Sequence, residues 1–220
     1  MDNSKHYPPP WILKGNGFIF AFLGNKKYNL TNSFMTEEST SAFEGGLAAC
    51  MLINYESSNV GPYYELLYIP GSFTYKNKSY KRITKIYVSS ETSIGEGIRN
   101  WAIPKEKADF IWEEIPDSDT TLIKVSKGKE TFLSVSLKKH FFHFPITTAL
   151  LPYKLLQKSE NCYLETQLKG FGKGKLATIQ KIETNETHFP DLFKAGCLKY
   201  GLSINPFEIE FPIPGRYDFE

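Results

Sequence analysis

The strongest constraint on the fold is a run of alternating segments in the middle of the chain. Residues 108–113, 120–126 and 131–137 alternate apolar with polar side chains, and short stretches around Pro116 and Gly128 separate them. A period of two places the apolar side chains on one face of a strand, and turn residues between such segments are typical of antiparallel pairing. The sequence therefore predicts an antiparallel β-meander here.

Other parts of the chain have the same character. Further strand-like segments, rich in aliphatic and aromatic residues, are 17–23, 63–69, 83–89, 162–168 and 176–184. Many short strands at fairly regular spacing favour a β-barrel or a β-sandwich. The sequence therefore predicts a mainly β protein.

Helix-like segments are few, which disfavours a parallel α/β fold. The strongest helix candidate is 191–198, with a proline ahead of it and a glycine behind. Residues 93–100 contain two glycines and predict only one or two helical turns. The apolar run 46–54 is compatible with either a strand or a helix. Residues 206–217 alternate around prolines and predict an edge strand.

The bulk composition limits the class of partner. The chain has 220 residues, of which 41% are hydrophobic and 15% aromatic, enough for one domain over 1–220 with a sizeable core. The net charge is only +2, and the acidic and basic residues are interspersed. We therefore expect neither a nucleic acid nor a membrane as partner.

Cysteine usage and the first residues indicate a compartment. Cys50, Cys162 and Cys197 are an odd number without metal-ligand spacing, which argues against a disulfide framework and fits a reducing compartment. Residues 1–14 are polar and rich in proline, without the apolar centre of a signal peptide. No run approaches the roughly 18 apolar residues of a spanning helix. We expect a soluble, cytoplasmic protein.

One lysine stands out as a candidate for chemistry. Lys105 follows Pro104, which fixes its own φ and stiffens the segment, and Trp101 and Ile103 just before it are residues typical of a protein interior. Burial would lower the pKa of the Lys105 amine and make it a nucleophile. The alternative is a surface lysine whose stem lies over apolar side chains.

Two motifs carry a resemblance to a known family. Gly97 is followed by six residues and then by Pro104 and Lys105, with Trp101 between them, and residues 61–65 have the pattern Gly-x-Tyr-x-Glu. In order and spacing, both motifs are similar to those of the acetoacetate decarboxylase superfamily. The resemblance implies a single-domain, cone-like, antiparallel β-barrel with a few peripheral helices, a mainly β (α+β) fold that assembles into homo-oligomers.

The resemblance also implies a chemistry. Lys105 would attack the ketone of a small oxo acid and form a Schiff base, with Glu65 as an acid–base and positioning group at the same pocket. The protonated imine is itself the electron sink, so that neither a metal nor an organic cofactor is required. We expect substrate-binding roles for Tyr63, Tyr87, Trp101 and Arg99. For Arg99, a local salt bridge is the alternative to a carboxylate clamp.

The sequence also departs from the family pattern. Glu106 stands where the decarboxylase has a second lysine, and no arginine precedes Arg82 to meet a substrate carboxylate. Because side chains alternate along an extended segment, Glu106 would face away and Lys107 would be the cationic neighbour of Lys105, whose pKa we expect burial to lower. Decarboxylation of a β-keto acid is the leading hypothesis. Aldolase or dehydratase chemistry and a non-catalytic barrel that binds an apolar small molecule are the alternatives.

Overall fold

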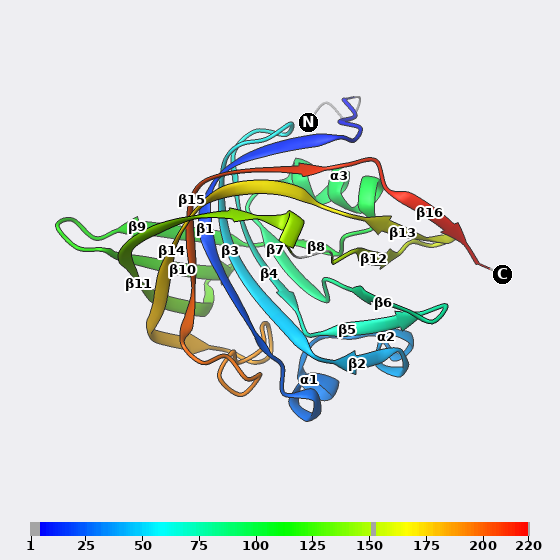
Figure 1. The fold of residues 1–220 in the computed structure, drawn as a ribbon, viewed down its shortest axis with the longest axis horizontal. Helices are drawn as coiled ribbons and strands as arrows, with labels where there is room; N and C mark the ends of the chain where they lie inside the picture. The colour runs from blue at the N-terminus through cyan, green and yellow to red at the C-terminus, as the bar shows by residue number, and fades with distance from the viewer. Residues whose placement is uncertain (1–4, 151–152, 220) are drawn as a thin grey trace.

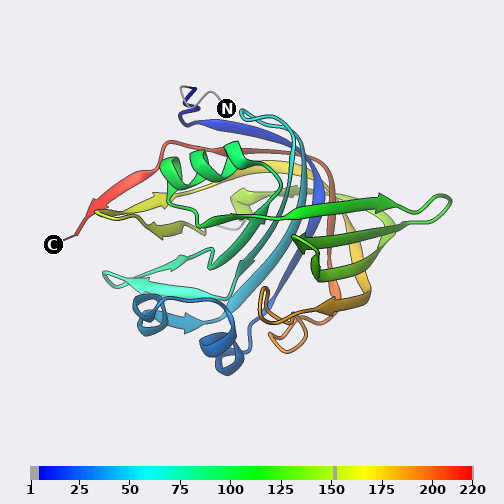
Figure 2. The same cartoon turned by 180° about the vertical axis from the view of Figure 1, so that it is seen from behind.

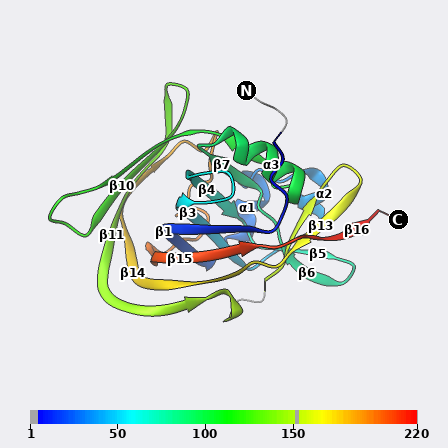
Figure 3. The ribbon, with the colours of Figure 1, turned by 90° about the horizontal axis from the view of Figure 1, so that it is seen from above.

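A large, curled β-sheet forms the wall of a barrel in the computed structural model, which describes residues 5–150 and 153–219. Its strands are β1 (Trp11–Leu23), β3 (Leu47–Ser57), β4 (Tyr63–Ile69), β7 (Lys85–Val88), β8 (Lys105–Lys107), β9 (Asp109–Glu114), β10 (Thr120–Lys127), β11 (Glu130–Thr147), β14 (Lys169–Thr184) and β15 (Tyr200–Phe211). Their hydrogen-bonded order is β8-β7-β4-β3-β1-β15-β14-β11-β10-β9, and the sheet is nearly closed (Figure 1). From above, β10, β11 and β14 wrap around one side of the molecule (Figure 3).

A smaller sheet and a few helices border the barrel. The sheet contains β2 (Phe43–Gly45), β5 (Ser72–Tyr75), β6 (Lys78–Lys81), β12 (Leu155–Lys158), β13 (Cys162–Thr166) and β16 (Gly215–Asp218). The helices are α1 (Lys26–Asn32), α2 (Glu37–Ser41) and α3 (Glu91–Trp101), with a short 3-10 turn η1 (Thr148–Leu150). Helix α3 lies at the end of the barrel near the N-terminus, and α1 and α2 lie at the opposite end (Figures 1 and 2). This architecture confirms the predicted mainly β, barrel-like fold with few helices.

No helix within residues 5–150 and 153–219 is long and apolar enough to cross a membrane.

Strand β3 packs against apolar side chains on both of its faces. Cys50 and Leu52 belong to an apolar core that β3 shares with β10, β11 and buried side chains of segment 189–197. Met51 and Ile53 point to the other face, into a second core that α3 also contributes to. A strand with two buried faces reads as a continuous apolar run instead of an alternating one. This explains why its sequence was compatible with a helix.

The helix predicted over 191–198 is wrong, because the segment forms turns. Asp191 caps a single turn, because its side chain accepts from the backbone N–H of Phe193 at 2.9 Å and its carbonyl oxygen accepts from the backbone N–H of Ala195 at 2.9 Å. Gly196 has a φ of 111°, and a Cβ atom there would lie 2.5 Å from the carbonyl oxygen of Leu23. Close packing on the end of β1 therefore fixes this segment, a tertiary effect that local propensity does not contain.

Helix α3 is longer than predicted. It has 11 residues and begins after Ser90, whose hydroxyl accepts from the backbone N–H of Ser93 at 3.2 Å. Two glycines in a helix interior cost about 1 kcal/mol each relative to alanine. Packing compensates for this cost, since Trp101 at the end of the helix is buried with its ring centroid 5.0 Å from that of Trp11.

Only part of the segment 206–217 forms the edge strand that the sequence predicts. Strand β15 pairs with β1 on one side and with β14 on the other, so the prediction of an edge strand is wrong there. Pro206 lacks a backbone N–H, and it lies where the register shifts on both sides of the strand. Strand β16 does lie at the edge of the smaller sheet, next to β13.

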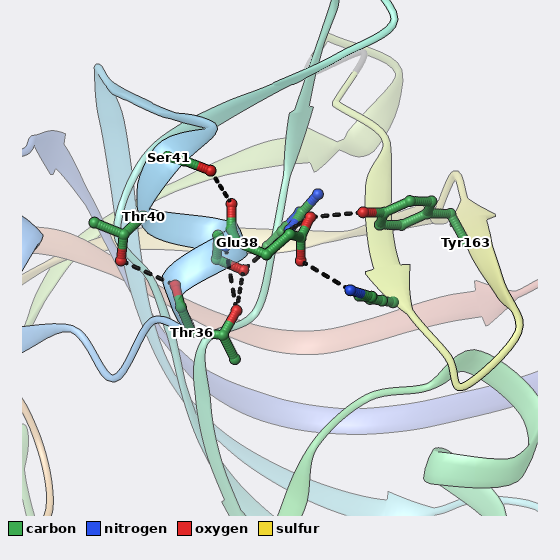
Figure 4. Close-up of polar contacts among 8 residues, drawn as sticks. Thr36, Glu38, Thr40, Ser41 and Tyr163 are labelled. Atoms are coloured by element: carbon green, nitrogen blue, oxygen red, sulfur yellow. Dashed lines mark hydrogen bonds and ion pairs between the residues drawn. The ribbon is translucent and has the colours of Figure 1, made fainter. Parts of the chain in front are cut away.

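A charged cluster fastens α2 to the smaller sheet (Figure 4). Glu38 of α2 pairs with Arg82 at 3.0 Å and accepts a hydrogen bond from the Tyr163 hydroxyl at 2.6 Å. Thr36 caps the same helix by accepting from the backbone N–H of Ser39 at 3.2 Å. The buried guanidinium of Arg82 thus has its counter-charge beside it, which is how proteins usually tolerate a buried cation.

Candidate active site

Lys105 enters the barrel wall directly after α3. The helix ends at Trp101, and its C-cap Ala102 has the left-handed φ of 53°. Lys105 then begins β8, which runs parallel to β7 with Lys105 opposite Ile86. The neighbouring β4 carries Glu65 opposite Val88 of β7. Strand β7 therefore joins the two sequence motifs, and both side chains point to the same face of the sheet.

Gly97 explains part of the motif that ends in Lys105. A Cβ atom at this position would lie 2.8 Å from Cδ and 2.9 Å from Cε of Lys105. Contacts this short between carbon atoms are strongly repulsive, so the stem of Lys105 passes α3 only because residue 97 has no side chain. The backbone N–H of Ile103 also donates to the carbonyl oxygen of Gly97 at 3.3 Å. The spacing between glycine and lysine is thus a packing requirement.

The Lys105 ammonium has three oxygen partners. Its Nζ lies 3.1 Å from Oε2 of Glu65, 3.0 Å from Oγ of Ser93 and 3.5 Å from the hydroxyl of Tyr63. The hydroxyl of Tyr55 donates to the other carboxylate oxygen of Glu65 at 3.1 Å. The side chains of Lys105 and Glu65 are only 5% and 3% exposed. The site is therefore a buried and fully hydrogen-bonded ion pair.

The electrostatic balance at Lys105 differs from the expected one. Burial acts to lower the pKa of Lys105, but the nearby Tyr63 and Glu65 oxygens outweigh it, so that the pKa of this amine is raised. The expectation that burial dominates is therefore wrong, because sequence alone did not show that Glu65 lies in contact. Burial raises the pKa of Tyr63 to about 12 and that of Tyr55 well above its usual value, so both hydroxyls stay protonated near neutral pH.

A cavity of about 260 Å³ adjoins the ion pair. Lys105 and Glu65 line it, and most of the remaining wall near them is aliphatic, namely Ile53, Leu67, Ile83, Ile86 and Ile103. Charges in such surroundings interact more strongly than in water, because little solvent screens them. The arrangement can hold an apolar molecule with a polar group beside the Lys105 amine.

The other predicted site residues lie in different places. Tyr63 contacts Lys105, as described above. Tyr87 points to the opposite face of the sheet, where its hydroxyl donates to the backbone carbonyl of His188 at 3.1 Å. Trp101 packs in the apolar core behind the cavity and donates from Nε1 to the carbonyl of Pro212 at 2.9 Å. None of the three, Tyr63, Tyr87 and Trp101, lines the cavity.

Arg99 lies on the outer side of α3. Its side chain is 60% exposed and pairs with Glu96 at 2.8 Å. The salt bridge that the sequence offered as the alternative is therefore the one that the structure contains. Arg99 does not line the cavity, so it is no carboxylate clamp there.

The two residues after Lys105 do not act directly on the pKa of its amine. Glu106 faces away, as expected, and pairs with Lys85 at 2.5 Å and Lys127 at 3.1 Å. Lys107 is 43% exposed at the surface and donates to the backbone carbonyl of Ser89 at 2.5 Å. The suggestion that Lys107 is the cationic neighbour of Lys105 is therefore wrong.

Sequence reasoning missed Ser93, Tyr55 and a second lysine, Lys81, which also lines the cavity. Ser93 precedes Gly97 by four residues, so that both lie on the same face of α3, and this spacing was a usable signal. Tyr55 and Lys81 belong to strands that reach the site only through long-range pairing. Their sequence surroundings gave no comparable signal.

Comparison with known proteins supports a relationship. The family model described as acetoacetate decarboxylase (ADC) matches residues 39–143, a range that contains both Glu65 and Lys105. No curated protein matches the sequence.

Solved structures share the fold. The enduracididine biosynthesis enzyme MppR with HEPES buffer bound is similar with a TM-score of 0.70 and 11% identity, over 100% of this chain and 91% of that chain. An acetoacetate decarboxylase-like enzyme from Sphingomonas wittichii RW1 has a TM-score of 0.69 at 10% identity, with 97% and 95% of the two chains covered. Acetoacetate decarboxylase from Legionella pneumophila subsp. pneumophila str. Philadelphia 1 has a TM-score of 0.65 at 12% identity, with 100% and 93% covered. Residues 39–143 of the chain thus match the acetoacetate decarboxylase family model, and the chain as a whole shares the fold of these enzymes.

Proposed function

We propose that the chain is a Schiff-base lyase that acts on an oxo acid through Lys105. The observation that carries this proposal is the buried Lys105 amine, in contact with a single carboxylate and facing an apolar cavity. A buried lysine is rare unless it is paired or functional, and this one adjoins space that a ligand can occupy.

The raised pKa of Lys105 requires a local base, since only the neutral amine attacks a carbonyl. Glu65, at 3.1 Å, is positioned to take the proton. The transfer converts an ion pair into a neutral pair, so that the site as a whole keeps its charge and no proton crosses the protein. Low polarity favours the neutral pair relative to water, because both charges vanish together.

The protons balance with Glu65 as a shuttle. The neutral amine adds to the ketone, and the carbinolamine oxygen collects the proton from Glu65 and leaves as water. The products are an iminium on Lys105, a carboxylate on Glu65 and one water molecule. Tyr55 donates to Glu65 and so helps to hold the carboxylate in reach.

The iminium then acts as an electron sink. In a β-keto acid, the electron pair of the bond to the carboxylate moves into the iminium, carbon dioxide departs and an enamine remains. Protonation of the enamine carbon and hydrolysis of the resulting iminium release a ketone and regenerate Lys105. No further redox partner is needed in this sequence.

The same iminium supports aldol, retro-aldol or dehydration chemistry, and one comparison favours this alternative. A structure of MppR is described as a complex with the condensation product of pyruvate and imidazole 4-carboxaldehyde. The present chain also has no arginine before Arg82. A non-catalytic barrel that binds an apolar molecule is a second candidate, favoured by the raised pKa of Lys105.

Reductive trapping tests the proposal. Borohydride added to the protein with a panel of oxo acids should reduce the iminium and block tryptic cleavage after Lys105, which yields a heavier peptide covering residues 100–107. Lys105→Met should abolish this adduct. Lys107→Met, which changes an exposed lysine, is the matched control and should retain it. Absence of any adduct with the whole panel would favour the non-catalytic barrel.

A further inference from the structure

Lys81 is the second lysine that lines the cavity. It ends β6, is 5% exposed and donates from Nζ to the backbone carbonyl of Leu47 at 2.6 Å and to Oγ of Ser72 at 3.0 Å. The ring centroid of Tyr153 lies 4.8 Å from the same nitrogen. An ammonium has three N–H donors, so one remains available to a ligand in the cavity.

The Lys81 ammonium lacks the carboxylate partner that the buried cations Lys105 and Arg82 have. Lys105 contacts Glu65, and Arg82 contacts Glu38. Across 5–150 and 153–219, Lys81 forms no ion pair with a carboxylate. Burial accordingly lowers the pKa of Lys81. A buried charge without a counter-ion is costly, and an anion that entered the cavity would remove much of that cost.

The two lysines lie far apart along the cavity wall. Lys81 is held at Leu47, whereas Glu65 is in register with Ile53 of the same strand, β3. Six residues of a strand at about 3.3 Å each separate these positions, which gives roughly 20 Å along the strand.

The wall between the two ends is mostly apolar. Ala49, Met51, Leu67 and Ile69 line it. Glu208 also lines the cavity, but it pairs with Lys14 at 2.9 Å. The cavity thus has one polar group suited to a carbonyl and another suited to an anion, with aliphatic side chains between them.

We propose that Lys81 binds the carboxylate of an elongated, apolar oxo acid whose carbonyl group lies at Lys105. The position of the carbonyl rests on the proposed function, whereas anion binding at Lys81 does not. A carboxylate at Lys81 lies too far from Lys105 to be the one lost as carbon dioxide. A substrate that is decarboxylated here therefore carries two carboxylates, and a substrate cleaved by retro-aldol chemistry needs only the one at Lys81.

The binding arm of the test uses ligands without a carbonyl. Calorimetry should show that dodecanoate binds the wild-type protein more tightly than dodecanol, which has the same chain and no charge. Lys81→Met should weaken dodecanoate binding about tenfold or more, as expected for loss of a charge-assisted hydrogen bond, and leave dodecanol binding unchanged. Lys154→Met, which removes a lysine from the surface outside the cavity, should bind both ligands as the wild type does.

The covalent arm separates the two proposals. Oxo acids with the ketone next to the terminal methyl group should label Lys105, and Lys81→Met should slow labelling by the longer acids but not by their methyl esters. Carboxylate binding that depends on Lys81 without any labelling of Lys105 would refute the proposed function and sustain the anion site. Equal affinity of the wild type for dodecanoate and dodecanol would overturn the anion site even if Lys81→Met fails to fold. A covalent adduct of an oxo acid on Lys81 itself would also overturn the anion site.

Discussion

At the scale of the residue, the ion pair of Lys105 and Glu65 is both a stabilising contact and the origin of the proposed chemistry. Burial and pairing act on the pKa of Lys105 in opposite directions, and pairing prevails. The protein therefore holds an ammonium, and the proposed reactivity depends on how readily Glu65 accepts its proton when a carbonyl compound enters the cavity. The cavity beside the pair is what distinguishes it from a conventional structural salt bridge.

The contribution of Lys105 to stability should persist into alkaline solution. Replacement by methionine leaves Glu65 buried without its partner and should cost about 3–5 kcal/mol in the free energy of unfolding near neutral pH. A folded-state pKa above the ordinary value of 10.5 means that this stabilisation is complete below 10.5 and is lost only as the pH rises through the raised value. Urea unfolding of both proteins across this pH range measures the difference.

The matched control for that series is Lys107→Met. Its exposed side chain should change the free energy of unfolding by no more than about 0.5 kcal/mol. A difference between the wild type and Lys105→Met that already disappears near neutral pH would mean that the folded protein holds a neutral amine. The raised pKa would then be wrong.

At the scale of the element, α3 and the strands beside it create the site. Helix α3 supplies Ser93 to the ammonium and a gap at Gly97 for the lysine stem, while β8 turns the same lysine back along β7. Two glycines weaken this helix in isolation, and only one of them is needed for packing. No heavy atom lies within 4 Å of a Cβ built at Gly95.

The two glycines of α3 should therefore respond differently to alanine. Gly95→Ala should stabilise the protein by up to about 1 kcal/mol, through helix propensity, without changing the trapping of Lys105. Gly97→Ala brings a methyl group into the lysine stem and should lower the rate of trapping about tenfold or more, since small displacements of a reacting group are costly. Thermal unfolding together with borohydride labelling checks both. Equal labelling of the two variants would contradict the packing role of Gly97.

Much of the fold, and the two residues at the centre of the candidate site, could be predicted from the sequence. The two motifs identified Lys105 and Glu65 because their spacing matches a known pattern. The resemblance implied that the two residues share a pocket, but their direct contact could not be predicted, since it depends on the order β8-β7-β4. Lys81 was missed because its surroundings are polar and resemble a surface strand, and only its position beside β5 and β3 buries it. The substrate-binding role expected for Tyr87 does not fit the structure. Side chains alternate along a strand, and its neighbour Ile86 lines the cavity, so that Tyr87 points to the opposite face.

At the scale of the whole molecule, the barrel provides a mostly apolar chamber with the two lysines far apart in its wall. Association of several chains is a separate expectation. We propose that the chain forms a homo-oligomer, as its resemblance to the superfamily implies. Multi-angle light scattering over a range of protein concentrations checks this. A mass equal to that of one chain at every concentration would contradict it.

The two buried faces of β3 have a consequence for how such a chamber can change. Met51 faces the chamber, whereas Cys50 and Leu52 hold the sheet against the core behind it. The odd positions of β3 thus shape the chamber, and the even positions stabilise the fold. Substitutions at every second residue of β3 can therefore change the length of ligand that the chamber accepts, while the residues between them keep the barrel folded.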